Sequence, residues 1–294
     1  MMKKTILITG ATDGMGKIMA TELALQGHHI ILHGRNKEKA DNVKLDIQQQ
    51  TGNENIDIVL ADLFSLDSIK SMTDEIKQNY SVLDVLINNA GAIMDKERSV
   101  TSDGLEKTMM LNVYAPFLIT YNLIDLLKNS KQGRIINTSS GTHRVASKPN
   151  FNDLQFEQKY SPSNAYATSK LFTIWLTRHW SQILNNQEHH HVTANVWHPG
   201  AAATSFGQAN DKGFINNMVF KVALPFMSTP EKGASTAIYL ASSPEVRHVS
   251  GKFFGKLKEE KPREKHYSEV NEQKIWDHCM QVTSDYRMPS LSLS

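Results

Sequence analysis

The feature that most constrains the fold is a set of glycines directly after the first apolar run of the chain. The run Ile6-Leu7-Ile8 is followed by Gly10, Gly14 and Gly16, and an amphipathic stretch starts at the last of them. In a strand that turns into a helix, the first glycine permits the tight turn and the second lets the backbone approach a pyrophosphate. The third lets the helix pack closely on the strand, and the phosphates lie at the positive helix end. The context therefore predicts a dinucleotide site that includes Gly10, Thr12, Asp13, Gly14, Met15 and Gly16.

Short runs rich in β-branched residues alternate with longer amphipathic stretches along the chain. Ile6-Leu7-Ile8 and Val85-Leu86-Ile87 are apolar throughout, which indicates strands buried on both faces. This alternation predicts an α/β fold, namely a doubly wound, mostly parallel seven-stranded sheet with helices on both faces (a Rossmann fold). The expected strands are residues 5–9, 29–33, 56–61, 82–87, 134–138, 192–197 and 252–254. The expected helices are residues 16–26, 37–50, 66–79, 105–128, 164–185 and 231–241.

Nothing in the sequence divides the 294 residues into separate domains. There is no Pro-, Gly- or Ser-rich linker and no internal repeat, so we expect a single Rossmann-type domain over residues 1–294. Its cofactor half would cover about residues 1–140 and its catalytic and substrate half residues 141–294. The charged stretch 256–265 is most simply a solvated loop.

Composition argues against several classes of partner. The net charge is +2, so no strong attraction to nucleic acid or to an anionic membrane is expected. Cys279 is the single cysteine, which is typical of a reducing compartment. The apolar run near the N-terminus is too short for a signal peptide, and no stretch is expected to span a membrane. These observations predict a cytoplasmic protein.

The end of the second expected strand indicates which dinucleotide binds. A site that prefers NAD(H) places Asp or Glu there to bind the ribose 2′-hydroxyl. This chain has no acid in Leu32-His33-Gly34-Arg35-Asn36. A guanidinium at Arg35 suits a 2′-phosphate, and Lys17 or Lys37 would add positive charge. We therefore expect NADP(H) to be favoured over NAD(H); the alternative is that Arg35 is a solvated loop residue.

Tyr166 and Lys170 are four residues apart in an expected helix, so they share one face. A phenol with an ordinary pKa is a poor proton shuttle at neutral pH, and a nearby ammonium is expected to lower that pKa. Such a pair by itself is also typical of a partly exposed helix face. Polar and small residues at strand ends favour the functional interpretation. Ser139 and Ser140 follow the fifth expected strand, where a hydroxyl can hydrogen-bond a substrate oxygen.

With these pieces in place, almost the whole chain resembles the short-chain dehydrogenase/reductase family. Four motifs occur in the family's order: the glycine turn, Asn88-Asn89-Ala90-Gly91, Ser140, and Tyr166 with Lys170. His198-Pro199-Gly200, with Thr204 beyond it, looks like the family's nicotinamide-side segment.

The resemblance implies a role for each matching residue. Tyr166 would donate or accept the proton, Lys170 would modulate its pKa and bind the nicotinamide ribose, and Ser140 would polarise the substrate oxygen. Ser139 stays open as the alternative serine. Asn112 would support a water-linked proton relay toward the lysine. The resemblance and the strand ends together extend the cofactor site to Arg35, Asn36, Asp62, Leu63, Asn89, Ala90, Gly91, Tyr166, Lys170, Pro199, Gly200 and Thr204.

The segment between Ser140 and Tyr166 is longer than in many family members. It looks like the corresponding segment of the retinol-dehydrogenase-like and WW-domain-oxidoreductase-like branch. Two further stretches also resemble that branch: Thr101-Ser102-Asp103-Gly104-Leu105-Glu106 and Val249-Ser250-Gly251-Lys252-Phe253-Phe254. Mammalian members of that branch often carry a membrane anchor, and none is expected here, so the resemblance does not imply a retinoid substrate. The family's long helices, here those with Asn112 and Tyr166, often form dimer surfaces, so the resemblance implies a homo-oligomer. Phe151, Leu154, Phe156 and Phe206 are expected either to line an apolar cleft or to pack within loops.

The sequence as a whole favours an NADP(H)-dependent oxidoreductase, that is, a carbonyl reductase or alcohol dehydrogenase acting on a small-molecule carbonyl or alcohol. The alternative is a non-catalytic NADP(H)-binding sensor or scaffold. A nucleotide-sugar epimerase is disfavoured because the chain after Gly200 is short for a second substrate domain. His189-His190-His191 lacks a second ligand cluster at suitable spacing, so no metal is expected.

Overall fold

A single mixed sheet forms the centre of the protein. The computed structural model describes residues 3–185, 191–200 and 229–288. The sheet has eight strands in the order β3-β2-β1-β4-β5-β6-β7-β8, and every neighbouring pair is parallel except β7 with β8. The strands are β1 (Thr5–Ile8), β2 (His29–Gly34), β3 (Ile56–Leu60), β4 (Val85–Asn88), β5 (Arg134–Thr138), β6 (Thr193–Trp197), β7 (Phe253–Gly255) and β8 (Lys258–Glu260).

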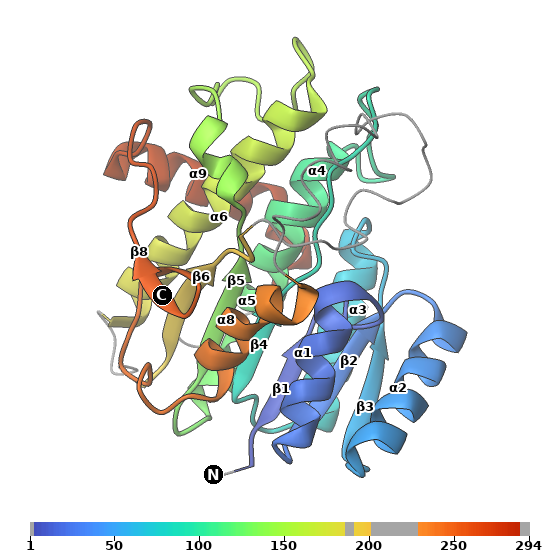
Figure 1. Cartoon of the computed structure of the whole chain (residues 1–294). Helices are drawn as coiled ribbons and strands as arrows, with labels where there is room; N and C mark the ends of the chain where they lie inside the picture. The colour runs from blue at the N-terminus through green and yellow to red at the C-terminus, as the bar shows by residue number, and fades with distance from the viewer. Residues whose placement is uncertain (1–2, 186–190, 201–228, 289–294) are drawn as a thin grey trace.

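Helices cover both faces of this sheet (Figure 1). Helices α1, α2 and α8 pack together on one face, and α3, α5 and α6 lie on the other. The α-helices are α1 (Gly14–Leu25), α2 (Lys37–Thr51), α3 (Leu66–Asn79), α4 (Lys107–Met109), α5 (Ala115–Lys128), α6 (Pro162–Asn185), α8 (Pro230–Ser242) and α9 (Glu269–Val282). The short helical turns are η1 (Met110–Tyr114), η2 (Gly141–Val145) and η4 (Ser284–Tyr286). The predicted doubly wound Rossmann fold is confirmed.

Alternate side chains of the central strands enter two separate cores. Ile6 and Ile8 belong to the core beneath α1 and α8, whereas Leu7 between them belongs to the core beneath α3, α5 and α6. All of these side chains are fully buried. Burial on both faces is the reason that these strands are continuously apolar.

The prediction of seven strands was wrong by one. Strand β8 lies inside the stretch 256–265 that was expected to be a solvated loop, and it forms a hairpin with β7. The two turn residues, Lys256 and Leu257, have positive φ angles of 50° and 63°. A two-residue hairpin of this kind normally carries Asn-Gly or Asp-Gly, so the sequence held no turn signal. The charged residues of β8 suit a short strand at the edge of a sheet.

The expected helix 105–128 is divided by a π turn. Glu106 is buried and caps the start of α4 by accepting from the amides of Thr108 and Met109. The π turn η1 then leads into α5. Contrary to expectation, Lys107–Lys128 has the length and hydropathy of a membrane span. However, 83% of its most apolar window is buried inside the protein, as in the core helix of a soluble fold.

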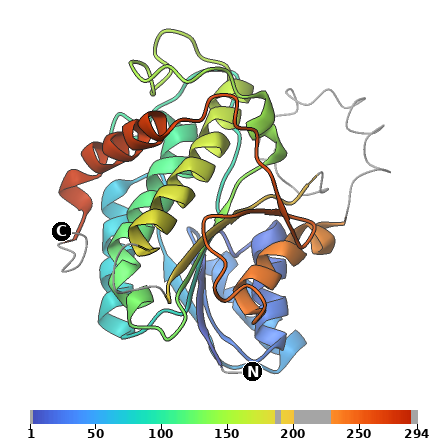
Figure 2. The ribbon, with the colours of Figure 1, turned by 90° about the vertical axis from the view of Figure 1, so that its left-hand side faces the viewer.

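The C-terminal segment 269–288, here called the strap, lies along the outer side of α5 and α6 (Figure 2). Ile275, Trp276 and Cys279 form the buried face of its helix α9. The Trp276 ring stacks on His179 with centroids 4.2 Å apart and meets Phe117 edge-on at 5.1 Å. Beyond α9, the backbone amide of Met288 donates to the buried Asn122 at 3.0 Å. The expected elements did not include this helix.

Candidate active site

The glycine turn joins β1 to α1 with little free space. Gly10 and Gly14 have φ angles of 63° and 48°, which favour glycine. A Cβ at Gly16 would lie 2.1 Å from the carbonyl oxygen of Gly10, so any larger residue would displace backbone. Asp13 caps α1 by accepting from Gly14, while Thr12 lies against Gly34. This is a close-packed cradle at a helix N-terminus, as a pyrophosphate requires.

A buried histidine that the sequence did not single out fixes this turn. The Gly10 amide donates to Nδ1 of His33 at 3.0 Å, and Nε2 of His33 donates to the carbonyl oxygen of Ala61 at 3.2 Å. Burial lowers the pKa of His33 to about 4. The ring is therefore neutral at physiological pH and joins the turn to β2 and β3. Its position inside an apolar strand gave no indication of this contact.

The end of β2 presents Arg35 to solvent. Asn36 caps α2 by accepting from the amide of Lys39 at 2.8 Å. Lys17 pairs with Asp46 and Lys37 with Asp41, so both are already neutralised by acids. Lys39 pairs with Asp13 at 2.7 Å, beside the glycine turn. For Arg35 the described part of the chain supplies no hydrogen bond or ion pair, which leaves its guanidinium available to a ligand.

The segment after β4 is held against the glycine turn. The amides of Asn89 and Ala90 both donate to the Thr9 hydroxyl, at 2.9 and 3.0 Å. A Cβ at Gly91 would lie 2.7 Å from Oδ1 of Asn112 and 3.0 Å from Nζ of Lys170. The absence of a side chain at Gly91 therefore lets the strand end pass directly over the lysine.

Asp62 and Leu63 follow β3 at the same edge of the sheet. The carboxylate of Asp62 is exposed and accepts from the amide of Phe64 at 3.0 Å, while Leu63 is buried. The remaining predicted cofactor residues, Pro199 and Gly200, follow β6 at this edge, and Gly200 has a φ of 71°. Thr204 lies outside the described residues.

Tyr166, Lys170 and Ser140 meet at the carboxyl end of β5. Nζ of Lys170 lies 5.5 Å from the centre of the Tyr166 ring and donates to the carbonyl oxygen of Thr138 at 3.0 Å. The side chain of Tyr166 is hydrogen-bonded to that of Ser140. The structure thus brings these residues together from β5 and α6.

The pKa of Tyr166 differs in direction from the sequence expectation. Burial raises it well above the ordinary value of a phenol, although the hydrogen bond with Ser140 acts in the lowering direction. Burial also lowers the pKa of Lys170 to about 7. Desolvation therefore outweighs the attraction between ammonium and phenolate in the free protein.

The two neighbouring serines have different surroundings. Ser139 is buried, and its hydroxyl donates to the carbonyl oxygen of Lys170 at 2.7 Å. Ser140 caps the turn η2, and its hydroxyl oxygen accepts from the amide of Thr142 at 3.2 Å. Ser139 thus donates its proton to the helix, whereas Ser140 faces Tyr166.

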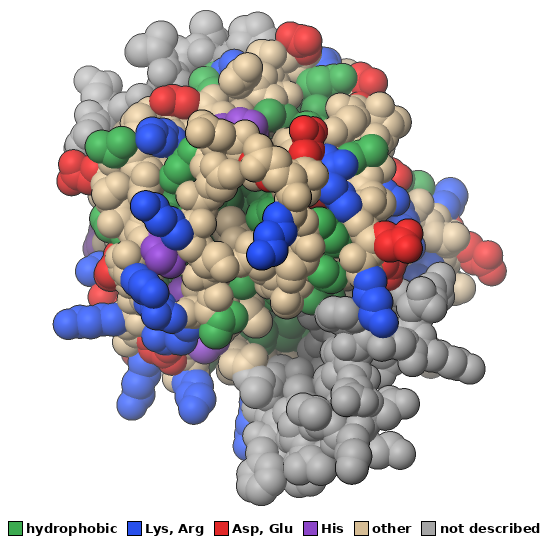
Figure 3. Space-filling view, turned by 90° about the horizontal axis from the view of Figure 1, so that it is seen from above, with side chains coloured by type: hydrophobic (Ala, Val, Ile, Leu, Met, Phe, Trp, Pro, Cys, Tyr) green, Lys and Arg blue, Asp and Glu red, His purple; other side chains and the backbone are tan. Residues whose placement is uncertain are grey.

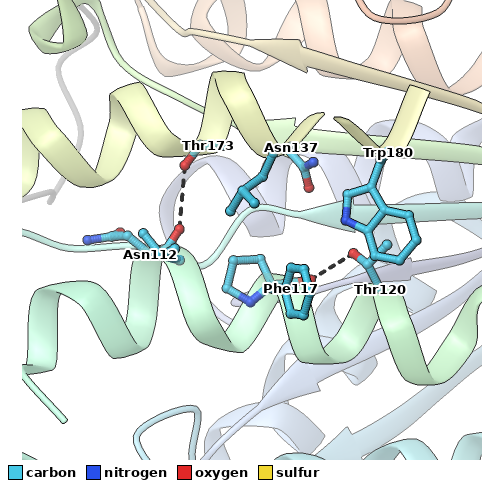
Figure 4. Close-up of a pocket in the computed structure, with 9 residues that line it drawn as sticks. Asn112, Phe117, Thr120, Asn137, Thr173 and Trp180 are labelled. Carbon is cyan, nitrogen blue, oxygen red and sulfur yellow. Dashed lines mark hydrogen bonds between the residues drawn. The ribbon is translucent and has the colours of Figure 1, made fainter. Parts of the chain in front are cut away.

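Asn112 lies in the π turn η1, and its side chain bonds to both backbone groups of Ala92. Its side chain accepts from the amide of Ala92 at 3.2 Å and donates to the carbonyl oxygen of Ala92 at 2.9 Å. A small cavity of about 20 Å³ extends from Asn112 between α5 and α6 toward Trp180 (Figure 4). This volume admits about one water molecule. Neither Tyr166 nor Lys170 lines the cavity, so it is separate from the site where a substrate would meet them.

Within the described part of the chain, apolar residues after Ser140 line a pocket whose lining does not include Tyr166. Phe151 packs on Phe172 with ring centroids 6.2 Å apart. Leu154 and Phe156 are buried and line an open pocket of about 500 Å³ together with Thr168, two residues along the helix from Tyr166. From above, this end of the molecule is hollowed, with hydrophobic side chains in the hollow and basic ones around it (Figure 3). Phe206 lies outside the described residues.

The His189-His190-His191 run is described only at His191, whose Nε2 donates to the carbonyl oxygen of Lys128 at 3.0 Å. Within the described ranges, no group of three His, Cys, Asp or Glu side chains is arranged to hold a metal ion.

Comparison with known proteins identifies the family to which this geometry belongs. A family model described as short chain dehydrogenase matches residues 4–213, which is more than half of the chain. The protein belongs to the short-chain dehydrogenase family. It is therefore an oxidoreductase whose fold binds a nicotinamide cofactor, and the resemblance to this family is confirmed.

Individual relatives of this short-chain dehydrogenase agree with the branch named from sequence. It is 36% identical to polyprenol dehydrogenase from Homo sapiens, over 95% of this chain and 85% of the relative. It is 38% identical to retinol dehydrogenase 14 from Mus musculus, over 93% of this chain and 84% of the relative. A short chain dehydrogenase from Shigella flexneri solved in complex with NADP is 26% identical with a TM-score of 0.65. That comparison covers 87% of this chain and 97% of the other.

Proposed function

We propose that this short-chain dehydrogenase is an NADP(H)-dependent carbonyl reductase or alcohol dehydrogenase in which Tyr166 is the general acid/base. The observation that carries the proposal is the meeting of Tyr166, Lys170 and Ser140 at the carboxyl end of β5, beside the glycine cradle. The bound nicotinamide would supply or accept the hydride. Every other step falls to side chains of the chain itself.

Tyr166 would supply the proton to the substrate oxygen. Because burial raises its pKa, the phenol is protonated at neutral pH and is suited to donate as a carbonyl becomes an alkoxide. Ser140 would donate a hydrogen bond to the same oxygen by turning its hydroxyl proton from Tyr166 toward the ligand, while its hydroxyl oxygen accepts from the amide of Thr142. The competing Ser139 is disfavoured because its proton is directed to the backbone of α6.

Lys170 would hold or return the proton next to Tyr166. Its pKa of about 7 lets it exist in both protonation states at physiological pH. Asn112 would position the segment that passes over Lys170, because it binds both backbone groups of Ala92. The family resemblance implies that Asn112 also supports a water-linked relay toward Lys170.

The preference for NADP(H) rests on the end of β2. Arg35 is exposed there, and no acid lies between Leu32 and Asn36. The ion pair of Lys39 with Asp13 places this lysine beside the glycine turn. The Shigella flexneri relative was solved with NADP, which supports the same choice. Asp62 and Leu63 would contact the adenine, and Pro199 and Gly200 the nicotinamide side.

The substrate class follows only from the relatives, which are named for retinol and for polyprenol. Both names denote isoprenoid alcohols, so these belong in any substrate screen together with small ketones and aldehydes. A cytoplasmic location, one domain with a cofactor half and a catalytic half, and the absence of a membrane contact also stay predictions.

The test is a panel of ketones, aldehydes and alcohols, including retinal and a polyprenal, followed at the NADPH absorbance with NADH in parallel. We expect turnover that is faster with NADPH and that falls by roughly 10²–10⁴-fold in Tyr166→Phe. Tyr239→Phe, which removes an exposed hydroxyl bonded to Glu245, is the control. Near-normal turnover of Tyr166→Phe would refute the proposal. Cofactor binding without turnover on any substrate would favour the sensor alternative.

A further inference from the structure

The hairpin β7–β8 lies next to two segments of the candidate site, the one that carries Ser140 and the one that carries Gly200. Strand β7 pairs with β6, whose end leads into His198-Pro199-Gly200. The turn of the hairpin is anchored on α8, because the amide of Leu257 donates to the hydroxyl of Thr236 at 3.1 Å. Strand β8 lies at the edge of the sheet, with β7 between it and β6 (Figure 1). The hairpin is therefore anchored to the rest of the fold, and residues bonded to it can hold the segments of Ser140 and Gly200 in place.

His143 joins the hairpin side to Ser140. Its Nδ1 lies 2.7 Å from the carbonyl oxygen of Ser140, and its Nε2 accepts from the amide of Arg263 at 3.2 Å. A carbonyl only accepts and an amide only donates, so His143 must be the neutral tautomer that carries its proton on Nδ1. The ring is buried, which lowers its pKa and maintains the neutral form.

His198 makes the equivalent connection on the nicotinamide side. Its Nδ1 accepts from the amide of Gly200 at 3.1 Å, and its Nε2 donates to Glu260 of β8 at 3.1 Å. His198 therefore carries its proton on Nε2, the opposite tautomer to His143. The lack of a side chain at Gly255 permits the approach, because a Cβ there would lie 2.4 Å from Nε2 of His198.

One aromatic ring separates the two histidines. Phe253 of β7 stacks on His198 with centroids 5.1 Å apart and rings 9° from parallel. His143 meets the same ring edge-on, with centroids 5.0 Å apart. Arg144 of η2 reinforces the connection through a 3.8 Å contact with Glu260. The two histidines are thus packed on one residue of the hairpin and bonded to backbone on either side of it.

We infer that His143 and His198 are positioning residues that fix Ser140 and Gly200 relative to each other by holding both to the β7–β8 hairpin. The inference rests on the proposed function, since it assigns these residues to the geometry of that reaction. Neither imidazole is required to touch a substrate, because each acts through a backbone group. Displacement of Ser140 by about 1 Å would slow the reaction by roughly 10²-fold.

The first measurement needs no activity. Long-range ¹H–¹⁵N spectra of ¹⁵N-histidine-labelled protein, assigned by His143→Asn and His198→Asn, should show His143 protonated on Nδ1 and His198 on Nε2. Glu260→Ala, a change at a partly exposed side chain, should leave His143 unchanged and release His198 to a mixture of tautomers. His143 protonated on Nε2 in the wild-type protein would overturn the inference.

The second measurement separates positioning from general stability. His143→Phe keeps the ring shape but neither hydrogen bond, so kcat should fall by roughly 10- to 100-fold while the Kd for NADPH stays unchanged. His143→Asn, whose amide can still donate to Ser140, should recover most of that loss. The exposed His248→Asn is the control.

The dependence of kcat on pH distinguishes a positioning role of His143 from a purely structural one, because a purely structural role would not change that dependence. The charged and titratable groups that face His143 are Arg144, His198 and Glu260. Because the pKa of His143 is lowered, its protonation should add a fall in the wild-type kcat at pH values below its ordinary range, and that acid limb should be absent in His143→Asn. Wild-type kcat in His143→Phe would overturn the inference even where Tyr166→Phe is inactive. Full activity of Tyr166→Phe would refute the proposed function instead.

Discussion

The ammonium of Lys170 lies 5.5 Å from the centre of the Tyr166 ring, in surroundings that disfavour its charge. It donates a hydrogen bond to the carbonyl oxygen of Thr138 at 3.0 Å, and the lysine is almost completely buried. A cation in this position lowers the stability of the folded state, so its retention is better explained by chemistry than by packing.

The lysine should therefore make stability depend on pH. Its pKa falls from 10.5 to about 7 on folding, so between these values the unfolded chain binds more protons than the folded chain. The free energy of unfolding should rise as the pH rises from 7 toward 10. Lys170→Met should raise the melting temperature at pH 7 by roughly 2–6 °C and abolish turnover. Thermal unfolding of both proteins at several pH values is the measurement, and a lower melting temperature for the variant contradicts the prediction.

Arg35 should decide between the two dinucleotides. Arg35→Asp removes the guanidinium and places a carboxylate at the end of β2, which suits a ribose 2′-hydroxyl. The ratio of the Kd values for NADH and NADPH should shift toward NADH by roughly 10- to 200-fold, since charge-assisted hydrogen bonds contribute about 1.5–3 kcal/mol. Fluorescence titration with each cofactor measures the ratio. Lys37→Ala, which removes a lysine paired with Asp41, is the matched control; an equal shift in that variant would count against Arg35.

The glycine turn should not tolerate one methyl group. In Gly16→Ala the Cβ would meet the backbone oxygen of Gly10 at 2.1 Å, so backbone must move. We expect loss of measurable NADPH binding and a decrease of about 1–3 kcal/mol in the free energy of unfolding. Gly141→Ala is the control, because the space around that position is open. Binding and urea unfolding of both variants give the comparison, and unchanged NADPH affinity in Gly16→Ala rules the prediction out.

The turn of the β7–β8 hairpin should gain stability from glycine. Lys256 and Leu257 both have positive φ, which costs residues with a Cβ about 1 kcal/mol each. The double change Lys256→Asn with Leu257→Gly should therefore raise the free energy of unfolding by roughly 1 kcal/mol. The double alanine variant retains the strain and should not be stabilised. Equal unfolding midpoints for the wild-type and Asn-Gly proteins would show that the turn is not strained.

Trp276 should anchor the strap. Trp276→Ala removes contacts with Phe117, His179 and Trp180 and should cost about 3–5 kcal/mol. Cys279 is the single cysteine of the chain and lies on the buried face of α9, so thiol labelling by a chromogenic disulfide reports directly on strap opening. Labelling should be slow in the wild-type protein and in the exposed-face variant Gln273→Ala, and faster in Trp276→Ala. Fast labelling of the wild-type protein would show that the strap is not seated.

The sequence predicted those parts of the fold in which local chemistry and tertiary contacts agree. The glycine turn, the parallel strands and the helices 37–50 and 66–79 follow from patterns that short-range sterics and burial impose directly. Strand β8 was missed because its turn uses Lys256-Leu257 instead of Asn-Gly. The exposed half of α9 is polar, and its buried half is recognisable only beside α5 and α6.

The candidate site divides in the same way into residues with a local sequence signal and residues whose roles depend on tertiary contacts. Tyr166, Lys170 and Ser140 were found because their spacing and strand-end positions carry the signal, but the raised pKa of Tyr166 was not foreseen. That direction depends on how completely the fold removes water from the phenol, and no sequence spacing expresses it. His33, His143 and His198 act through contacts with residues distant in sequence, so only the folded arrangement shows them.

The strap has a consequence for how this dehydrogenase meets copies of itself. The resemblance implied an oligomer joined through the helices that carry Asn112 and Tyr166. In this chain Trp276, Cys279 and Met288 take up the outer side of those helices. The strap therefore occupies the face that the resemblance assigned to a partner subunit. A second copy that packs on this side of α5 and α6 would meet the strap before it meets the two helices.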